Sequence, residues 1–314
     1  MTSCLVTGGA GFIGSSIARV LLRRGDRVRI LDDFSTGKRD NLDGMAGPIE
    51  LIEASILDEA ALARAVEGID VIFHQAAVAS VASSMADPAA THEVNATGTL
   101  RVLEAARRAG VRRLVYAASA AAYGDSPVLP KVETMAPAPL SPYAAAKLAG
   151  ELYCQVYAAG FGVETVCLRY FNVFGPRQDP TAEYAAVIPR FASAALAGEG
   201  VTIYGDGEQS RDFCFIDDVV EANLAAASRP GISGGVFNVA TGTAVSLNQI
   251  VRALEGVVSR PIPVTRTARR PGDVMHSRAD VAAARTRLGF EAATALTEGL
   301  RKTVEWFAGP ARPA

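Results

Sequence analysis

The sequence predicts an α/β protein: a doubly wound parallel sheet followed by a smaller, irregular α/β domain. Short apolar strand patterns alternate with helical patterns from residue 3 to about residue 168, and repeated strand–helix units build a parallel sheet. A glycine-rich turn follows the first strand directly. After residue 170, Gly and Pro become frequent and the strand and helix patterns become short and irregular. We therefore expect ligands at the carboxyl ends of the strands, with the second domain closing a cleft over them.

The first expected strand, residues 4–6, runs into a turn with regularly spaced glycines. The strand is apolar and partly β-branched, as a strand buried on both faces is. The turn reads TGGAGFIG over 7–14 and places glycines at Gly8, Gly11 and Gly14. Glycines let the backbone turn tightly and approach a pyrophosphate, and the N-terminus of the following helix offers free N–H groups to that anion. The motif predicts that the protein binds a dinucleotide.

The second expected strand, residues 27–31, ends in two acidic residues, Asp32 and Asp33. A carboxylate at this distance from the glycine turn is placed to accept hydrogen bonds from the adenosine ribose. The acidic pair also repels a 2′-phosphate, so the expected cofactor is NAD. Lys38 and Arg39 leave NADP open, because nearby cations tolerate a phosphate.

The other elements continue the same alternation. The expected helices cover 15–24, 59–66, 91–109 and 143–159, and the further strands cover 49–53, 71–74, 114–118 and 164–169. We expect an NAD-binding domain over 1–168 to which 212–240 returns, a substrate domain over 169–211 and 241–308, and a frayed tail over 309–314.

The helix expected over 143–159 begins with Tyr143-Ala-Ala-Ala-Lys147. A tyrosine and a lysine four residues apart lie on one face of a helix. An ammonium beside a phenol lowers the pKa of the phenol and makes it a proton acceptor near neutral pH. The spacing alone is common on surface helices, but beside a dinucleotide site it indicates a redox pair.

Bulk properties exclude several classes of protein. The net charge of −2 argues against nucleic acid as the main partner. No apolar run reaches the ~18 residues of a membrane span, and the first strand starts too early to leave room for a signal peptide. The four cysteines lie far apart and are expected to be reduced core residues of a cytoplasmic protein. The three histidines show no ligand spacing, so no metal is expected.

Segments spread over nearly the whole chain carry a family resemblance. They are TGGAGFIG (7–14), HQAAVASV (74–81), EVNATGT (93–99), SAAAYG (119–124), SPYAAAK (141–147), LRYFNVFGPRQDP (168–180), AVIPRF (186–191), YGDGEQSRDFCFIDD (204–218) and RRPGDVMHSRAD (269–280). The sequence resembles the extended short-chain dehydrogenase/reductase family, and within it the nucleotide-sugar 4-epimerases of the UDP-glucose/UDP-N-acetylglucosamine type. The first domain is then expected to be Rossmann-like.

The resemblance implies a role for each matched residue. Tyr143 would be the base, Lys147 would orient the nicotinamide ribose, and Ser119 would hydrogen-bond the reacting hydroxyl, while Asn95 would support Lys147 through the helix backbone. The implied cofactor-binding residues are Gly8, Gly11, Phe12, Ile13, Gly14, Asp32, Asp33, Ser35, Thr36, Gly37, Ser55, Ile56, Gln75, Ala76, Ala77, Asn95, Tyr143, Lys147 and Tyr170. The implied substrate-binding residues are Ser80, Ser119, Asn172, Val187, Tyr204, Arg211, Arg270, Asp273 and Ser277.

One position departs from the family pattern. Family members often carry Gly-Asp-Ile after the third strand, where the acid contacts the adenine, but this chain has Ala54-Ser55-Ile56. Ser55 can still hydrogen-bond but carries no charge. We therefore expect somewhat weaker retention of NAD.

The residues around Ser119 discriminate among the reactions of related enzymes. Related dehydratases place Asp-Glu directly after the Ser/Thr and decarboxylating relatives place Glu there, whereas this chain continues Ala120-Ala121-Ala122. The resemblance then favours oxidation and re-reduction at C4 of a UDP-hexose. Ser277 stands where a tyrosine restricts relatives to UDP-glucose and UDP-galactose, so a 2-acetamido group is expected to fit as well.

Two other functions stay open at this stage. A UDP-uronate 4-epimerase would need a cation near the C6 carboxylate, which Arg177 or Arg190 could supply. A non-catalytic NAD-sensing protein on the same fold is the second, because fold does not fix function. The resemblance also implies a homodimer, in which the helices near 91–109 and 143–159 pair as a four-helix bundle.

Overall fold

The computed structural model describes residues 1–181, 186–269 and 274–309. Over these residues the centre of the fold is a seven-stranded, all-parallel sheet in the order β10-β6-β5-β4-β1-β2-β3. Its strands are β1 (Ser3–Thr7), β2 (Arg27–Asp32), β3 (Ile49–Glu53), β4 (Val71–His74), β5 (Arg113–Ser119), β6 (Glu164–Tyr170) and β10 (Gly235–Val239). The strand order reverses between β1 and β4, which places a ligand crevice at their carboxyl ends. The predicted Rossmann-like, doubly wound sheet is confirmed.

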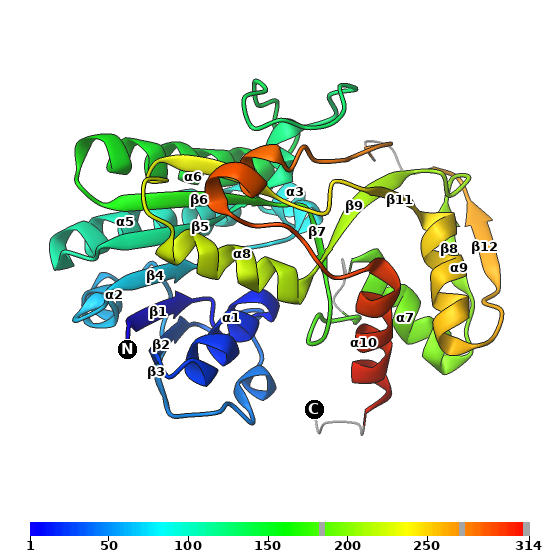
Figure 1. Ribbon diagram of the computed structural model, residues 1–314, viewed down its shortest axis with the longest axis horizontal. Coiled ribbons are helices and arrows are strands. Elements are labelled where there is room, and N and C mark those ends of the chain that lie inside the picture. Colours follow the sequence, from blue (N-terminus) through cyan, green and yellow to red (C-terminus); the bar gives the residue numbers. More distant parts are fainter. Residues whose placement is uncertain (182–185, 270–273, 310–314) are drawn as a thin grey trace.

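Helices cover both faces of this sheet (Figure 1). The helices α1 (Phe12–Arg23) and α8 (Ile216–Ser228) pack on one face, and α2 (Glu59–Val66), α5 (Gly98–Ala109) and α6 (Pro142–Gly160) pack on the other. Side chains alternate accordingly along each strand. In β1, Val6 belongs to the core cluster on the α1 face and Leu5 to the cluster on the α5 face. Burial on both faces explains the uninterrupted apolar strand patterns in the sequence.

The helix expected over 91–109 is present but is not regular throughout. It begins as α4 (Pro88–His92), passes through a π-helical turn over Glu93–Thr97, and continues as α5. Asp87 caps the start, because its carboxylate accepts a hydrogen bond from the Ala90 N–H. Such π-helical turns are frequent at functional sites, and this one carries Asn95.

The smaller part of the fold lies to the right in Figure 1. It contains a three-stranded sheet of β7 (Asn172–Phe174), β9 (Ser210–Phe215) and β11 (Ala244–Ser246), and a strand pair of β8 (Val201–Tyr204) and β12 (Val264–Thr267). Helices α7 (Val187–Ala197), α9 (Leu247–Val258) and α10 (Leu296–Ala308) pack together beside these strands. Between β9 and β11 the chain returns to the large sheet, where it forms α8 and β10.

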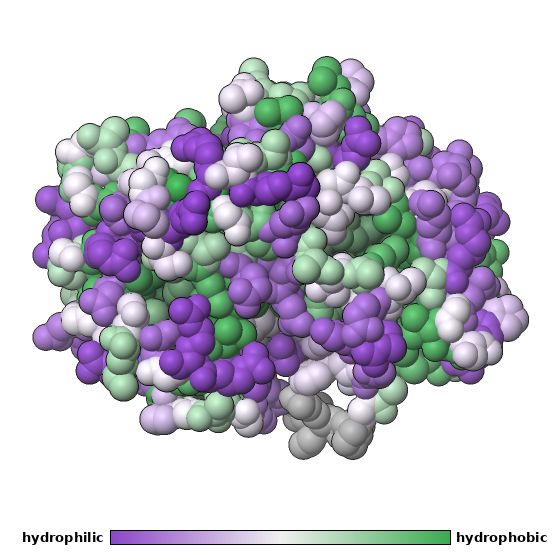
Figure 2. Space-filling view, in the orientation of Figure 1, coloured by the Kyte–Doolittle hydropathy of each residue, from purple (hydrophilic) through white to green (hydrophobic). Residues whose placement is uncertain are grey.

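Two absences hold for the described ranges only. No helix there is long and apolar enough to cross a membrane. No group of three or more His, Cys, Asp or Glu side chains there is arranged to hold a metal ion. Figure 2 shows hydrophilic residues spread over one face of the molecule, on both its larger and its smaller part.

Candidate functional site

A cavity of about 440 Å³ opens at the carboxyl ends of β1, β2, β4 and β5. Most of the residues predicted to bind the cofactor line it, and Ser119 lines it too. The predicted residues that the cavity brings together are Gly8, Gly11, Phe12, Ile13, Gly14, Asp32, Asp33, Ser35, Thr36, Gly37, Ile56, Gln75, Ala76, Ala77, Ser119, Tyr143, Lys147 and Tyr170. The cavity lies at the point where the strand order reverses.

The glycine turn between β1 and α1 has no room for side chains. Gly8 has a φ of +67°, and a Cβ there would lie 2.6 Å from the Ala76 backbone nitrogen. A Cβ on Gly14 would lie 2.1 Å from the Gly8 carbonyl oxygen. Gly11 stands at the N-cap of α1 and has no side chain to satisfy the first N–H groups of the helix. The turn therefore forms a backbone cradle with the positive end of a helix behind it, which suits a diphosphate.

Asp32, at the end of β2, is held rigidly beside this cradle. Its two carboxylate oxygens accept hydrogen bonds from the N–H groups of Ala10 and Phe34, each at 2.8 Å. Burial raises the pKa of Asp32, and these two hydrogen bonds oppose that rise. Gly37 packs so closely that a Cβ there would lie 2.7 Å from the carboxylate. The acid is thus fixed in place, with lone pairs left for hydroxyl donors of a ribose.

The three predicted catalytic residues line one wall of the cavity. Ser119 ends β5, and its Oγ accepts a hydrogen bond from the Ala121 N–H at 3.1 Å. Tyr143 lies in the first turn of α6, which the side chain of Ser141 caps. One turn later, Lys147 is buried and its Nζ donates a hydrogen bond to the Ala117 carbonyl oxygen at 2.9 Å. The end of β5 and the start of α6 thus bring a hydroxyl, a phenol and an ammonium together.

The pKa of Tyr143 is shifted upward in the structure, whereas the sequence predicted a downward shift. Burial raises the pKa of the Tyr143 phenol, and a side-chain hydrogen bond with Ser119 only partly opposes this rise. Burial also lowers the pKa of Lys147 to about 8. The expected net lowering of the Tyr143 pKa is therefore wrong for this structure. Removal from water disfavours both charged forms, and the ammonium donates to a backbone carbonyl.

Two predicted cofactor residues, Ser55 and Asn95, do not line the cavity. Ser55 Oγ instead accepts a hydrogen bond from the Leu57 N–H. The buried Asn95 amide accepts from the Val78 N–H at 2.8 Å and donates to the Val78 carbonyl at 3.0 Å. Because Val78 is part of the cavity wall, Asn95 supports that wall from behind.

The predicted substrate residues that the structure describes, other than Ser119, also lie outside this cavity. Ser80 caps the short helix α3 (Val81–Ala86), while Asn172, Val187 and Tyr204 belong to β7, α7 and β8. Arg211 in β9 donates from Nη1 to the carbonyl oxygens of Ser210 and Met275, and the Ser277 N–H donates to Ser210 O at 3.0 Å. Arg211 and Ser277 therefore meet along β9. Arg270 and Asp273 lie outside the described residues.

Comparison with known proteins identifies the relatives of this fold and cavity. A model of the NAD dependent epimerase/dehydratase family matches residues 4–240. The chain is also 42% identical over 307 residues to a UDP-glucose 4-epimerase of Mycolicibacterium smegmatis, which covers 96% of this chain and 97% of the relative. The chain belongs to the NAD dependent epimerase/dehydratase family. The resemblance inferred from the sequence motifs is thereby confirmed.

Solved structures of family members superpose over nearly the full length of the chain. A UDP-N-acetylglucosamine 4-epimerase from Methanobrevibacter ruminantium, in complex with UDP-N-acetylmuramic acid, matches with a TM-score of 0.94 and 39% identity over 98% of each chain. A UDP-glucose 4-epimerase from Thermus thermophilus, in complex with NAD, matches with a TM-score of 0.90 and 38% identity, covering 98% of this chain and 100% of that one. The cofactor of the family, NAD, fits the cavity described above, because the glycine cradle admits a diphosphate and Asp32 stands beside it.

A buried hydrogen-bond chain that the motifs did not reveal supports this family cavity. Thr7 Oγ1 lies 2.7 Å from His74 Nδ1, and His74 Nε2 lies 3.0 Å from Thr99 Oγ1. Thr99 in turn donates to the Asn95 carbonyl at 2.7 Å. Complete burial lowers the pKa of His74 to about 3, so the ring stays neutral and links β1, β4 and the π-helical turn. The apolar strand pattern around His74 gave no sign of this role.

Several cavity residues were also missed by sequence reasoning. They are Leu31, Lys38, Asn41, Ala54, Val78, Ala79, Val94, Ala117, Ala118, Phe171, Val173, Arg177 and Asp179. Most are apolar wall residues without a chemical signature. Arg177 and Asp179 had a signal, because they belong to a segment that carried the resemblance, but their place beside the dinucleotide depends on tertiary structure.

Proposed function

We propose that this protein is an NAD-dependent C4 epimerase of UDP-hexoses. Its substrates are UDP-glucose and UDP-galactose, together with UDP-N-acetylglucosamine and UDP-N-acetylgalactosamine. The observation that carries the proposal is the cavity wall formed by Ser119, Tyr143 and Lys147 beside the dinucleotide cradle. The small side chains of Ala120–Ala122, directly after Ser119, add no acid or base to that wall.

Each residue of the wall has a defined task in this reaction. When bound, NAD would supply reversible hydride transfer at C4 of the sugar. Tyr143 takes the proton of the 4-hydroxyl and gives it back, and Ser119, which hydrogen-bonds Tyr143, orients that hydroxyl. Because burial raises the pKa of the phenol, Tyr143 needs a cation to work near neutral pH, and Lys147 lies one helical turn away.

The relatives support this choice of reaction and substrate class. The M. smegmatis relative is a UDP-glucose 4-epimerase, and the M. ruminantium relative is a UDP-N-acetylglucosamine 4-epimerase. We propose that UDP is held from the β9 side, where Arg211 and Ser277 lie together, with Arg270 and Asp273 completing the site. Guanidinium groups suit this role because their planar donors pair with phosphate oxygens.

The alternative of a UDP-uronate 4-epimerase finds little support in the positions of its two candidate cations. Arg177 Nη2 donates to Ser16 Oγ at 3.3 Å, and its guanidinium lies over the Trp306 ring. Arg190 is exposed on α7. The two Arg177 contacts hold its guanidinium at α1 and α10 rather than at Ser119 and Tyr143, and Arg190 does not line the cavity. The complete Ser119, Tyr143 and Lys147 set likewise disfavours a non-catalytic NAD sensor.

The proposal is tested by incubating the purified protein, without added NAD, with five sugars: UDP-glucose, UDP-galactose, UDP-N-acetylglucosamine, UDP-N-acetylgalactosamine and UDP-glucuronate. Epimer ratios are then measured by chromatography. Conversion of the four neutral sugars toward equilibrium is expected, with no change in UDP-glucuronate. Turnover of UDP-glucuronate alone would establish the uronate alternative, and no turnover of any sugar would favour the sensor.

The same set of substrates tests the proposed role of Ser277. Ser277→Tyr is expected to lose the two N-acetylated substrates while keeping UDP-glucose and UDP-galactose, because a phenol ring fills the space that the acetamido group needs. Equal loss on all four substrates would contradict the assignment of Ser277 as the residue that limits the size of the sugar.

We also propose that two copies of the chain associate through α5 and α6. The outward face of α6 exposes Leu152, Tyr153 and Val156, with 51%, 40% and 53% of their surface accessible. Exposed apolar side chains clustered on one helix mark an interaction surface.

Val156→Glu is expected to shift the protein from dimer to monomer in sedimentation equilibrium. Val128→Glu, at a similarly exposed apolar residue outside these helices, is the control and should leave the mass unchanged. A monomeric unmodified protein would refute the dimer.

A cytoplasmic location is a further part of this proposal. All four cysteines, Cys4, Cys154, Cys167 and Cys214, are buried and unpaired, as in proteins of reducing compartments. Burial raises the pKa of the Cys4 thiol to about 12, which makes it unreactive. Cell fractionation with an antibody against the chain tests the location, and recovery outside the cytoplasmic fraction would contradict it.

A further inference from the structure

The segment after β7 crosses the rim of the dinucleotide cavity, although the sequence gave it no cofactor role. Arg177 and Asp179, both in this segment, line the cavity together with Lys38 from the loop after β2. Arg177 adopts a left-handed backbone conformation, with a φ of +71°. For a residue with a side chain this costs on the order of 1 kcal/mol or more, and it persists only where the surrounding structure enforces it. Backbone strain of this kind clusters at functional sites, which indicates a functional role for the segment around Arg177.

The Arg177 side chain is held between the first and the last helix of the fold. Nη2 donates to Ser16 Oγ at 3.3 Å, and Ser16 lies two residues beyond Gly14, close to the N-terminus of α1. On the other side, Cζ lies 5.0 Å from the centre of the Trp306 ring in α10. These two contacts place the Arg177 guanidinium beside the N-terminal end of α1. That helix end lies behind the glycine cradle that we expect to bind a diphosphate.

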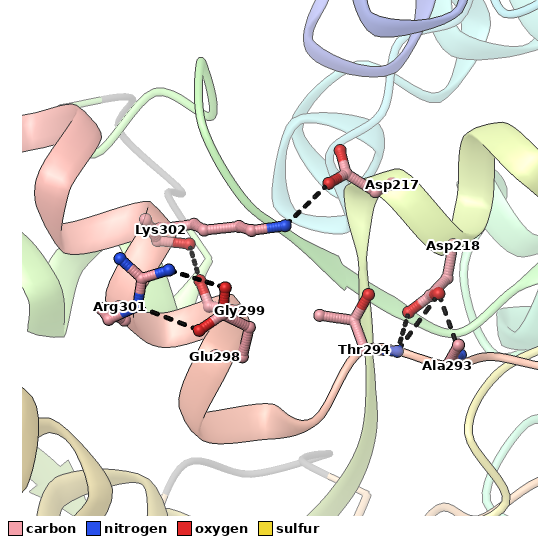
Figure 3. Close-up of polar contacts among 9 residues, drawn as sticks. Asp217, Asp218, Ala293, Thr294, Glu298, Gly299, Arg301 and Lys302 are labelled. Carbon is pink, nitrogen blue, oxygen red and sulfur yellow. Dashed lines mark hydrogen bonds and ion pairs between the residues drawn. The ribbon is translucent and has the colours of Figure 1, made fainter.

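Helix α10, which carries Trp306, is held to α8 by polar contacts (Figure 3). Lys302 in α10 pairs with Asp217 at the start of α8, with Nζ 3.3 Å from Oδ2. The neighbouring Asp218 accepts hydrogen bonds from the N–H groups of Ala293 and Thr294, just before α10. Because α8 packs on the sheet and against α1, these contacts hold α10 and its tryptophan in register with the cavity.

A second contact crosses the cavity rim beside Arg177. Lys38 Nζ lies 2.7 Å from Asp179 Oδ2, joining the loop after β2 to the segment after β7. Both side chains are partly exposed, so this ion pair alone contributes little to stability. Burial of Asp179 opposes ionisation, but hydrogen bonds from Lys38 and Thr181 outweigh it and lower the pKa of the carboxyl. The ion pair therefore persists at neutral pH and closes part of the rim.

The charges of the cavity wall distinguish Arg177 from the other cations. Among the described residues that line it, Lys38 is paired with Asp179, and Lys147 lies at the Tyr143 end and donates to Ala117. Arg177 brings a guanidinium to this wall, and its hydrogen bond to Ser16 places that group beside the first turns of α1. Planar guanidinium donors match the oxygens of a diphosphate better than an ammonium does.

We propose that Arg177, backed by Trp306, contacts the diphosphate of the bound dinucleotide, and that the Lys38–Asp179 pair closes the cavity over its adenosine half. Together they slow the release of NAD and offset the missing acid at Ser55. This inference rests on the proposed function only through its cofactor, and it concerns retention of NAD rather than the epimerisation step.

The test compares Arg177→Gln with Arg252→Gln, which removes the same charge from an exposed position on α9. The protein loaded with NADH is mixed in a stopped-flow instrument with excess NAD, which replaces NADH as it dissociates, and the release of NADH is followed over time. Trp306 is the only tryptophan of the chain, so energy transfer from it to the reduced nicotinamide gives a direct signal. Arg177→Gln is expected to release NADH at least roughly tenfold faster, as for the loss of one charge-assisted contact. Arg252→Gln should match the unmodified protein.

Further variants separate contact from folding. Arg177→Lys keeps the charge but loses the planar donors, and an intermediate release rate is expected with an unchanged melting temperature. Lys38→Gln and Asp179→Asn should each raise the release rate a few-fold, and the double variant should release no faster than either single one. A wild-type release rate in Arg177→Gln would overturn the inference, and additive effects of Lys38→Gln and Asp179→Asn would overturn the ion-pair part. No UDP-sugar enters these measurements, so loss of the proposed epimerase activity and loss of this inference are distinguishable.

Discussion

Tyr143→Phe is expected to abolish epimerisation while leaving NAD bound. The substitution removes only the phenolic oxygen, the group proposed to take and return the proton of the sugar 4-hydroxyl. Loss of a positioned acid–base group lowers kcat by roughly 10²–10⁴-fold. The ring still fills its place in the first turn of α6, so the cradle and Asp32 stay intact. Conversion of UDP-glucose to UDP-galactose is the measure of activity, and NAD released on denaturation is the measure of binding.

The same helix offers a matched control for this variant. Tyr153 lies on α6 but is 40% exposed and outside the cavity. Tyr153→Phe removes an equal hydroxyl and is expected to leave kcat unchanged. If Tyr143→Phe retained near-normal activity, Tyr143 would not be the proton acceptor. If it lost both activity and NAD, the phenol would act in binding rather than in chemistry.

The parts of the site that could be predicted from the sequence are formed by residues that lie close together along the chain. The glycine turn and Asp32 follow one another along the chain, and each needs only its own backbone conformation to be recognisable. Tyr143 and Lys147 are one helical turn apart, so their common face follows from the helix alone. Alternation of strands and helices likewise predicted the parallel sheet.

What the sequence did not predict depends on residues far apart in the chain. Arg177 reaches the cavity because α10 and α1 hold it from two sides, and no local pattern encodes that contact. The neutral His74 that links Thr7 to Thr99 is invisible in an apolar strand pattern. The raised pKa of Tyr143 has the same origin, since burial is a property of the assembled fold and outweighs the hydrogen bond with Ser119.

Gly14→Ala is expected to destroy NAD binding and to destabilise the protein. The added Cβ would lie 2.1 Å from the Gly8 carbonyl oxygen and 2.9 Å from the Gly8 carbonyl carbon and the Gly9 Cα. All three atoms belong to the backbone, so no side-chain rotation relieves the clash and the turn itself must shift. Overpacking of this kind typically costs about 1–3 kcal/mol. NAD content after purification and the melting temperature measure the two effects.

Helix propensity alone predicts the opposite result, and a matched control makes the contrast measurable. Alanine is preferred over glycine within a helix by about 0.8–1 kcal/mol. Gly256 lies inside α9, and a Cβ there would meet no atom within 4 Å. Gly256→Ala is therefore expected to raise the melting temperature slightly and to leave NAD content unchanged. If Gly14→Ala were equally harmless, the close approach of α1 to the Gly8 backbone would not be what shapes the cradle. Opposite signs for the two substitutions are expected, because propensity acts at both glycines but the backbone clash acts only at Gly14.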